Sequence, residues 1–278
     1  MAEARLLHHR TGSLALGGRT LVMGVVNVTP DSFSDGGVHF RPDDAVAGAL
    51  RMAQEGADIL DVGGESTRPG YSGISAEEEW ARVRPVLERL AQERLPPVSI
   101  DTTKAAVARR ALLAGAAIVN DIWGFQHDPE LARVAAEFGA AAVLMHNRES
   151  LDGSLDIVDD MLRFFERSLA IARGAGVPND RIVLDPGIGF GKTLAQQLQA
   201  IAGLPRLKAL GFPVLLGVSR KSFIGRLFDP PPPVAERLPG TLAANAFGVM
   251  VGADIVRVHD VAAHVQALTV LGALRRAA

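Results

Sequence analysis

Short apolar segments rich in Val, Ile and Ala alternate along this chain with longer amphipathic segments. The apolar segments have the length and the continuous hydrophobicity of strands that are buried on both faces, as in a parallel sheet. Polar or turn-forming residues follow each of them, which is typical of strand ends. Eight strands are predicted in this way, at Thr20–Val28, Ile59–Gly63, Val98–Asp101, Ile118–Asp121, Ala141–His146, Ile182–Asp185, Val214–Ser219 and Ile255–His259.

A helical segment is predicted after each strand, because apolar residues recur there at the spacing of one helix face. The seventh of these regions is split by glycines and prolines. The predicted helical regions are Asp43–Glu55, Ala76–Arg94, Thr103–Ala114, Pro129–Phe138, Asp156–Arg173, Thr193–Ala202, Ser222–Val251 and Val261–Arg275.

The alternation predicts an α/β protein with a (β/α)8 TIM barrel, in which residues 1–278 form one domain. A doubly wound parallel sheet is the second possibility. Gly-Ala pairs, as in Gly56-Ala57-Asp58 and Gly252-Ala253-Asp254, stand where a helix would end and a tight turn would lead to the next strand. A short N-terminal hairpin turning at Gly17-Gly18 is expected before the barrel, and Pro230–Pro233 is interpreted as a rigid loop within the seventh βα connection.

The composition mainly shows which partners and which kinds of site can be excluded. The net charge of -2 gives no electrostatic reason to expect nucleic acid or an anionic membrane as a partner. The absence of cysteine excludes disulfides, thiolate metal sites and a cysteine nucleophile. We find no apolar run of signal-peptide or membrane-span length, so we expect a cytoplasmic protein whose partners are small molecules.

Polar residues gather where the predicted strands end, whereas the strand starts are small and apolar. In a TIM barrel the carboxyl ends of the strands carry the active site. Some of these residues could instead cap the following helix, and we expect this of Asp43, Asp121 and Asp128. The polar strand ends are Asn27, Gly63–Arg68, Asp101-Thr102, Asn120-Asp121, His146-Asn147, Asp185, Ser219–Lys221 and Arg257–His259.

Two glycine-containing motifs resemble known catalytic patterns but do not satisfy them. Asp185–Thr193 lacks a glycine that the phosphate-binding loop of nucleotide triphosphatases requires, and Gly217–Lys221 has lysine where a nucleophile elbow requires glycine. We expect Asp185 to point into the barrel mouth and Phe190 to lie over a flat ligand. Lys221 is either a surface lysine or, as its place at a strand end favours, a ligand contact.

The last strand places Arg257 and His259 on one face, since side chains alternate along a strand. Together with Lys221 they favour an anion site, as phosphate often binds near the last two strands of a barrel. The alternative is a core arginine paired with Asp260 or Asp101.

Three further side chains leave neighbouring strands. Asp101, Asn120 and Asp185 suit a heterocycle with several N–H donors and a carbonyl group. The alternative is that these three bridge buried backbone groups or hold a divalent metal. His146 is expected to line the pocket wall.

Seven segments, which include the polar strand ends above, give the chain a resemblance to the dihydropteroate synthases, folate-pathway enzymes that sulfonamides target. The resemblance runs in order over nearly the full chain, and the first two segments are specific in combination. The matching segments are Asn27–Gly37, Gly63–Gly70, Ser99–Thr102, Val119–Asp121, Asp185–Lys192, Ser219–Ser222 and Arg257–Val261.

The resemblance implies a transferase that joins 4-aminobenzoate to 6-hydroxymethyl-7,8-dihydropterin diphosphate and gives dihydropteroate, with Mg²⁺ and commonly as a homodimer. Asn27, Lys221, Arg257 and His259 would be the catalytic residues, with Asn27 also at the metal. The pterin would be bound by Asp101, Asn120, Asp185, Lys221, Arg257 and Phe190, and the diphosphate by Asn27, Arg68, Arg257 and His259. Phe33, Thr67, Arg68, Pro69 and Ser222 would shape the aminobenzoate pocket, with contributions from Phe190 and Lys221.

The two specific loops are implied to close over the reaction, with Thr29–Gly37 as a lid in which Asp31–Gly37 should be disordered or displaced until diphosphate binds. The fifth strand end departs from the family pattern at Asn147–Ser150, and we carry no contact over to it. Two alternatives remain: a methyltetrahydrofolate-binding methyltransferase domain and a non-catalytic pterin-binding homologue.

Overall fold

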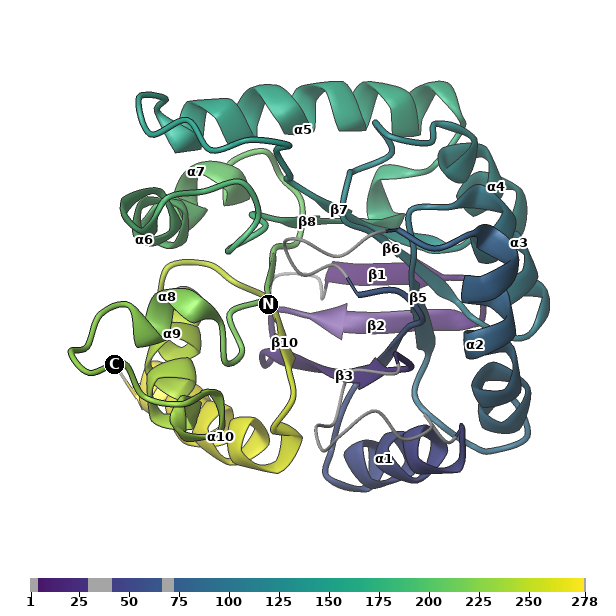
Figure 1. Ribbon diagram of the computed structural model, residues 1–278, viewed down its shortest axis with the longest axis horizontal. Helices are drawn as coiled ribbons and strands as arrows, with labels where there is room; N and C mark the ends of the chain where they lie inside the picture. Colours follow the sequence, from purple (N-terminus) through teal and green to yellow (C-terminus); the bar gives the residue numbers. More distant parts are fainter. Residues whose placement is uncertain (1–4, 30–41, 67–72, 278) are drawn as a thin grey trace.

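Eight parallel strands form the centre of the protein, whose computed structural model describes residues 5–29, 42–66 and 73–277 (Figure 1). Their order in the sheet is β8-β7-β6-β5-β4-β3-β10-β9. A bridge between Leu184 and Val214, with Leu184 N donating to Pro213 O at 2.9 Å, joins the two edges and brings the sheet close to a full barrel. The strands are β3 (Leu21–Asn27), β4 (Ile59–Gly63), β5 (Val98–Asp101), β6 (Ile118–Asp121), β7 (Ala141–Met145), β8 (Ile182–Asp185), β9 (Leu215–Leu216) and β10 (Ile255–Val258).

Helices surround these strands in Figure 1, so the predicted (β/α)8 TIM barrel is confirmed. No helix within the described residues has both the length and the apolar character that crossing a membrane requires. The helices are α1 (Pro42–Gln54), α2 (Ala76–Leu90), α3 (Ala105–Leu113), α4 (Glu130–Phe138), α5 (Ile157–Gly174), α6 (Leu194–Ala202), α7 (Leu204–Lys208), α8 (Ser222–Gly225), α9 (Leu238–Met250) and α10 (Val261–Ala277), with short 3-10 turns η1 (Asn179–Arg181) and η2 (Val234–Glu236).

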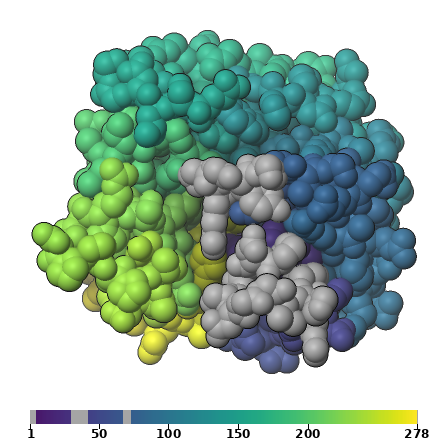
Figure 2. Space-filling view, in the orientation of Figure 1, coloured from purple at the N-terminus to yellow at the C-terminus, as the bar shows by residue number. Residues whose placement is uncertain are grey.

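The seventh βα unit is the least regular. Its strand β9 has two residues where six were predicted, because the chain turns away from the ladder, with Lys221 N donating to Val218 O at 3.2 Å. The helical region is split into α8, η2 and α9, as expected. Pro230–Pro233 lie between α8 and η2, in a segment that projects from the side of the molecule in Figure 2.

Side-chain alternation divides the barrel into an inner and an outer face. Leu21, Met23, Ile59, Val183 and Ile255 belong to one buried cluster, while the residues between them pack in a second cluster against the helices. Because inward positions recur at every second residue, the same faces carry the polar residues at the carboxyl ends of the strands. The apolar layer thus forms the base on which those polar residues stand.

The N-terminal hairpin closes the amino end of the barrel. Strands β1 (Arg5–His9) and β2 (Gly12–Leu16) pair antiparallel, and Leu7 and Leu16 join the inner apolar cluster. The predicted turn at Gly17-Gly18 is wrong, because His9 pairs with Gly12 and the chain turns at Arg10-Thr11. This register buries Leu7 and Leu16 against the barrel, which a turn at the glycines would not do.

Two aspartates connect neighbouring strands at this amino end. Asp58 accepts a hydrogen bond from Val22 N at 2.9 Å, and Asp254 accepts one from Val214 N at 2.8 Å. Both follow a Gly-Ala pair that ends a helix, so the repeated Gly-Ala-Asp sequence turns the chain and satisfies a backbone donor of the adjacent strand.

We expect Asp254→Ala to lower the free energy of unfolding by about 1–3 kcal/mol, since Val214 N–H would lose its acceptor in a part-buried position. Asp254→Asn should lose less than half of that, because its amide oxygen can still accept from Val214 N, although the ion pair with Lys208 is lost. Urea denaturation of the two variants tests this, and equal losses would contradict the role of the backbone hydrogen bond.

Candidate active site

Arg257 of β10 lies between two carboxylates on the inner face of the barrel. Its Nε donates to Asp61 Oδ2 at 2.6 Å and its Nη2 to Asp101 Oδ2 at 2.7 Å. Asp61 is fully buried, so the guanidinium provides the charge that this carboxylate needs. Of the two partners that the core-arginine alternative named, Asp101 is confirmed and Asp260 is wrong, because Asp260 pairs with Arg220 outside this group. Asp61 was missed by the sequence analysis, although a charged residue within a buried strand was visible in Ile59–Gly63.

Asn120 extends this network to β6. Its Nδ2 donates to Asp61 Oδ2 at 3.1 Å, and its Cα is the register partner of Asp101. Burial raises the pKa of Asp101 to about 7, with Arg257 acting in the opposite direction and Asp61 adding to the rise. The structure therefore brings together three predicted residues, Asp101, Asn120 and Arg257, around one unpredicted carboxylate.

Asp185 ends β8, and Lys221 stands between β9 and α8, as the N-cap of that helix. Asp185 Oδ1 accepts a hydrogen bond from Gly187 N at 2.8 Å, and burial raises the pKa of this carboxyl group while Lys221 lowers it. Lys221 donates to the carbonyl of Ile188, and its Nζ lies 4.6 Å from the centre of the Phe190 ring. Burial lowers the pKa of Lys221 to about 8, with Asp185 opposing the shift.

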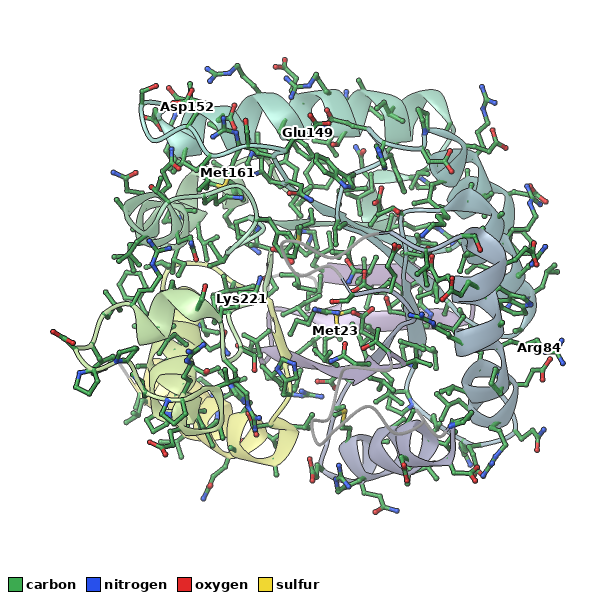
Figure 3. All side chains as sticks on the ribbon, in the orientation of Figure 1. Met23, Arg84, Glu149, Asp152, Met161 and Lys221 are labelled. Carbon is green, nitrogen blue, oxygen red and sulfur yellow. The ribbon has the colours of Figure 1, made fainter. Side chains whose placement is uncertain are left out.

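Lys221 is therefore not a surface lysine. Figure 3 shows it near the barrel centre together with Met23, whereas Arg84 lies at the outer edge. Ser222 begins α8 at an exposed position beside it.

Lys192 organises the loop that follows β8. It is buried, and its Nζ donates to the carbonyl oxygens of Gly187 (2.8 Å), Phe190 (3.0 Å) and His146 (3.4 Å). A phosphate-loop lysine would point out to its ligand, so this inward position agrees with the rejection of that motif. The role of Lys192 was missed because sequence spacing does not show which way a loop side chain turns.

His259 and Asn27 lie at the carboxyl ends of β10 and β3. Ser219 Oγ bonds both the backbone N–H (3.2 Å) and the ring Nδ1 (2.9 Å) of His259, which holds the exposed imidazole at the mouth. Asn27 ends β3 on the inward face, half-buried, with Gly63 as its partner on β4. His259, Asn27 and Arg257 are thus on adjacent strands.

The described residues contain no group of three or more His, Asp or Glu side chains that could hold a metal ion by themselves. Asn27 offers an oxygen at the mouth, and Mg²⁺ often takes only one or two protein ligands when a phosphate-bearing substrate supplies others. The donor set fits Mg²⁺ brought in with such a substrate, and does not fit a resident metal cage.

The loop after β4 is fixed at its two ends. Glu65 Oε1 accepts from Ile74 N at 2.8 Å, and Glu65 Oε2 receives Lys104 Nζ at 2.5 Å. Lys104 also donates to the buried Glu79 at 2.7 Å. Glu65 belongs to the polar strand end Gly63–Arg68, but no role was predicted for Lys104 or Glu79. Four predicted site residues lie outside the described residues, as does most of the expected lid: Phe33, Thr67, Arg68 and Pro69.

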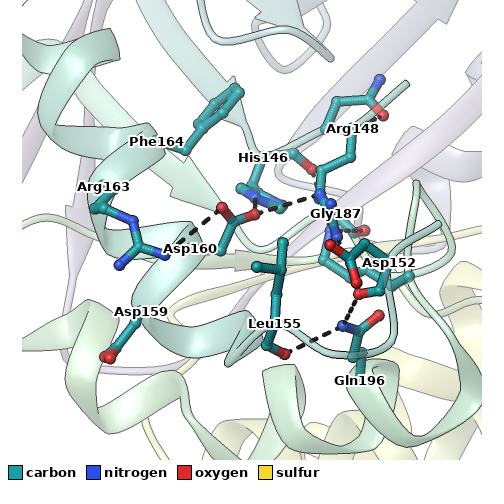
Figure 4. A network of polar contacts seen from close by, with 12 residues as sticks. His146, Arg148, Asp152, Leu155, Asp159, Asp160, Arg163, Phe164, Gly187 and Gln196 are labelled. Atoms are coloured by element: carbon teal, nitrogen blue, oxygen red, sulfur yellow. Dashed lines mark hydrogen bonds and ion pairs between the residues drawn. The ribbon is translucent and has the colours of Figure 1, made fainter. Parts of the chain in front are cut away.

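His146 faces away from the pocket, contrary to the expectation for it. Its neighbour Met145 pairs with Asp185, so His146 points outward to α5, where Nε2 lies 3.1 Å from Asp160 Oδ2 and the ring packs on Phe164 (Figure 4). Burial lowers the pKa of His146 to about 2, so the neutral ring donates this hydrogen bond.

The loop after β7, which differs from the family pattern at Asn147–Ser150, is held by contacts with α5 and α6. Gln196 Nε2 donates to the carbonyl oxygens of Asp152 (2.7 Å) and Leu155 (3.3 Å), and Arg148 Nε lies 3.5 Å from Asp160 (Figure 4).

The expected capping aspartates behave in two ways. Asp121 accepts from Trp123 N (2.9 Å) and Phe125 N (2.6 Å) in a turn that precedes α4, so its assignment as a helix cap is wrong. Asp128 accepts from Glu130 N (3.1 Å), the first residue of α4, as predicted, and also from Ala105 N (2.9 Å). Asp43 lies within the first turn of α1 and pairs with Arg89 instead, so its assignment as a cap is wrong.

Comparison with known proteins gives one consistent family. Residues 23–259 match the model of a family described as pterin binding enzyme. The chain is 50% identical over 259 residues to dihydropteroate synthase from Bacillus subtilis, covering 93% of this chain and 90% of that protein.

Solved structures agree with this. Dihydropteroate synthase from Xanthomonas albilineans with 4-aminobenzoic acid superposes with a TM-score of 0.92 at 45% identity, covering 98% of both chains. The same enzyme in complex with 7,8-dihydropteroate gives a TM-score of 0.84 at 44% identity, covering 94% of this chain and 96% of the other.

We expect Gly187→Ala to disrupt the loop after β8, because a Cβ there would collide with the backbone carbonyl of His146, which Lys192 also contacts. Gly176→Ala is the matched control: both glycines have positive φ (64° and 88°), but a Cβ at position 176 meets nothing within 4 Å. Gly176→Ala should lose only the roughly 1–2 kcal/mol of a left-handed alanine, and Gly187→Ala clearly more. Thermal denaturation compares them, and equal losses would show that the collision is relieved without penalty.

Proposed function

Since the chain belongs to the pterin-binding enzyme family and is a dihydropteroate synthase, we propose that the mouth of its barrel joins 4-aminobenzoate to 6-hydroxymethyl-7,8-dihydropterin diphosphate. The observation that carries this proposal is the inward group of Asp101, Asn120, Asp185 and Lys221 around Arg257, at the carboxyl ends of the strands. The 50% identity to a dihydropteroate synthase supports it over the methyltetrahydrofolate alternative.

The pterin ring is bound by complementary donors and acceptors. The carboxylates of Asp101 and Asp185 and the amide of Asn120 accept from ring N–H groups, and Lys221 donates to the ring carbonyl or nitrogen. Because two carboxylates hold the edge of the Arg257 guanidinium, one of its faces is left to stack on the ring. Phe190, beside Lys221, closes this part of the pocket.

The diphosphate is bound at the adjoining strand ends. Arg257 and His259 donate to its oxygens, Arg68 is proposed to join them from outside the described residues, and Asn27 would supply an oxygen ligand to Mg²⁺. When bound, Mg²⁺ neutralises negative charge that develops on the departing diphosphate.

The chemistry needs no protein nucleophile. The exocyclic C–O bond breaks with its electron pair going to diphosphate, and the pterin ring stabilises the positive carbon that remains. The aromatic amine of 4-aminobenzoate then bonds to that carbon and loses a proton. Arg257 and His259 stabilise the leaving group. Ser222, with Phe33, Thr67 and Pro69, is proposed to shape the aminobenzoate pocket and to keep water from the carbon.

We also propose a homodimer formed by α9 and α10, which pack together near the C-terminus. Phe247 and Met250 on α9 and Val270 and Leu274 on α10 are each more than half exposed. Apolar side chains at this density are typical of an interface between subunits. Sedimentation velocity of the purified protein tests this assembly.

We expect Arg257→Ala and Lys221→Ala to lower diphosphate release by at least about 100-fold when the protein is incubated with 4-aminobenzoate, the pterin diphosphate and Mg²⁺. Each removes a half-buried cationic donor from the site, and removal of one preorganised donor to a developing charge costs roughly 100- to 1,000-fold in rate in comparable enzymes. Arg84→Ala is the control, since Arg84 is exposed on α2 and far from the mouth.

Wild-type protein that releases no diphosphate would contradict the synthase function. Release that persists in Arg257→Ala and Lys221→Ala would contradict the site. Consumption of methyltetrahydrofolate only with a corrinoid protein would identify the methyltransferase alternative.

The rate at low pterin concentration should fall as the pH falls below about 7. The ionised form of Asp101 accepts from a ring N–H much more strongly than the protonated form. Its pKa in the free protein is raised from 3.8 to about 7, so its ionised fraction decreases about tenfold for each pH unit below that value. The pH profile of kcat/KM for the pterin measures this. Asp101→Asn should be less active but should lack this acidic limb, and an unchanged limb in that variant would assign it to another group.

A further inference from the structure

We propose that Asp61 is a positioning residue of the pterin site: it determines which atom of Asn120 faces the ligand and where the guanidinium of Arg257 lies. This inference rests on the proposed pterin-binding function and concerns a residue that does not itself contact the substrate.

Asp61 lies directly beneath the layer of pterin-binding residues. It points inward from β4, one layer below Asp101, since Asp61 pairs with Ser99 and Gly63 with Asp101 in the parallel ladder. Gly63 is the next inward position above Asp61 and has no side chain. A Cβ there would already lie 3.4 Å from the Cβ of Asp101. The absence of a side chain at Gly63 lets the Asp61 carboxylate reach the residues that bind the ligand.

The hydrogen bond from Asn120 fixes the orientation of its amide. Asp61 Oδ2 already accepts from Arg257 Nε, and a carboxylate oxygen that accepts from this charged donor has no hydrogen of its own to donate to Asn120. The NH₂ group of Asn120 must then face Asp61, which is the 3.1 Å contact observed, and its Oδ1 faces the other way. Asn120 consequently presents an acceptor to the ligand, so the pocket selects an N–H group at that point and disfavours a ring nitrogen or carbonyl.

Asp61 also limits how Arg257 uses Asp101. Arg257 divides its donors, with Nε on Asp61 and Nη2 on Oδ2 of Asp101. Without Asp61, the guanidinium could turn to bind both oxygens of Asp101 in the bidentate manner that arginine favours. It would then compete with the ligand for Asp101 and lose the orientation that stacking on the pterin requires.

The local packing does not explain Asp61 by stability alone. Asp61 Oδ1 and the neighbouring Ser99 Oγ are both buried without a hydrogen-bond partner in the described structure. A buried ion pair that leaves polar atoms unsatisfied is on average no more stable than apolar residues of the same volume. The position of the charge, rather than its contribution to folding, is what this arrangement provides.

Asp61→Asn tests the proposal, because it keeps the shape of the side chain and removes its charge. The measurement is calorimetric binding of 6-hydroxymethyl-7,8-dihydropterin diphosphate with Mg²⁺ and without 4-aminobenzoate, from pH 5.5 to 8.5. We expect Asp61→Asn to weaken binding roughly 10- to 100-fold at pH 8. Ser99→Ala, which alters the adjacent inward position without changing charge, should stay within about threefold of wild type.

The pH dependence separates positioning from a structural effect. The charged groups that act on Asp101 and Lys221 are Arg257, Asp61, Glu79, Asp121 and Asp185. Among them Asp61 raises the pKa of Asp101, so its neutralisation should move the acidic limb of binding to lower pH. The limb should not move in Ser99→Ala. Wild-type affinity with an unmoved limb in Asp61→Asn would overturn the proposal.

A measurement on the wild-type protein covers the case in which Asp61→Asn does not fold. With ¹⁵N-labelled asparagine, the side-chain NH₂ of Asn120, assigned by its loss in Asn120→Ala, should be protected from solvent exchange before any ligand is added. Exchange at the rate of an exposed amide would overturn the proposal. Failure of the wild-type protein to bind the pterin diphosphate would instead contradict the proposed function, so the two failures are distinguishable.

Discussion

The ion pairs of Arg257 with Asp61 and Asp101 are the interaction on which the polar end of the barrel depends. A barrel interior is a poor environment for isolated charge, and each of these groups is acceptable there only because the others are within hydrogen-bonding distance. The pKa shifts of Asp101 and Lys221 show the same constraint, since burial pushes both groups toward their neutral forms. A ligand with N–H donors and an anionic group replaces the water that such a site would otherwise need.

The scaffold supplies this polar end through strand alternation. Every second residue points inward, so one strand can contribute an apolar residue to the base and a polar residue to the mouth, as Ile255 and Arg257 do in β10. The loops that follow the strands then complete the surface of the barrel mouth. Lys192 binds three carbonyl oxygens of its surroundings and so gives the loop after β8 a fixed shape without a regular element.

Most of the fold could be predicted from the sequence because the apolar segments are short, regular and clearly separated. The inward directions of Asp101, Asn120, Asp185, Arg257 and His259 followed from their places at strand ends. The direction of His146 did not, since a strand that ends in Met145-His146 can place either residue inward until its register with β8 is known. The hairpin turn was misplaced because the Gly17-Gly18 pair is typical of a turn, whereas the burial of Leu7 and Leu16, which sets the strand register, is not visible in the sequence. Asp61 and Lys192 were missed because their partners are distant in sequence and only the folded chain brings them together.

The hairpin at the amino end of the barrel affects where substrates can enter and products can leave. Leu7 and Leu16 fill the base of the barrel, and the interior above them is packed with side chains rather than open. In the proposed reaction, both substrates would therefore enter and both products leave at the carboxyl end of the strands. The pterin, bound at Asp101 and Asn120, would pass the site of 4-aminobenzoate on its way in and out, so a molecule bound at the outer position would slow its exchange.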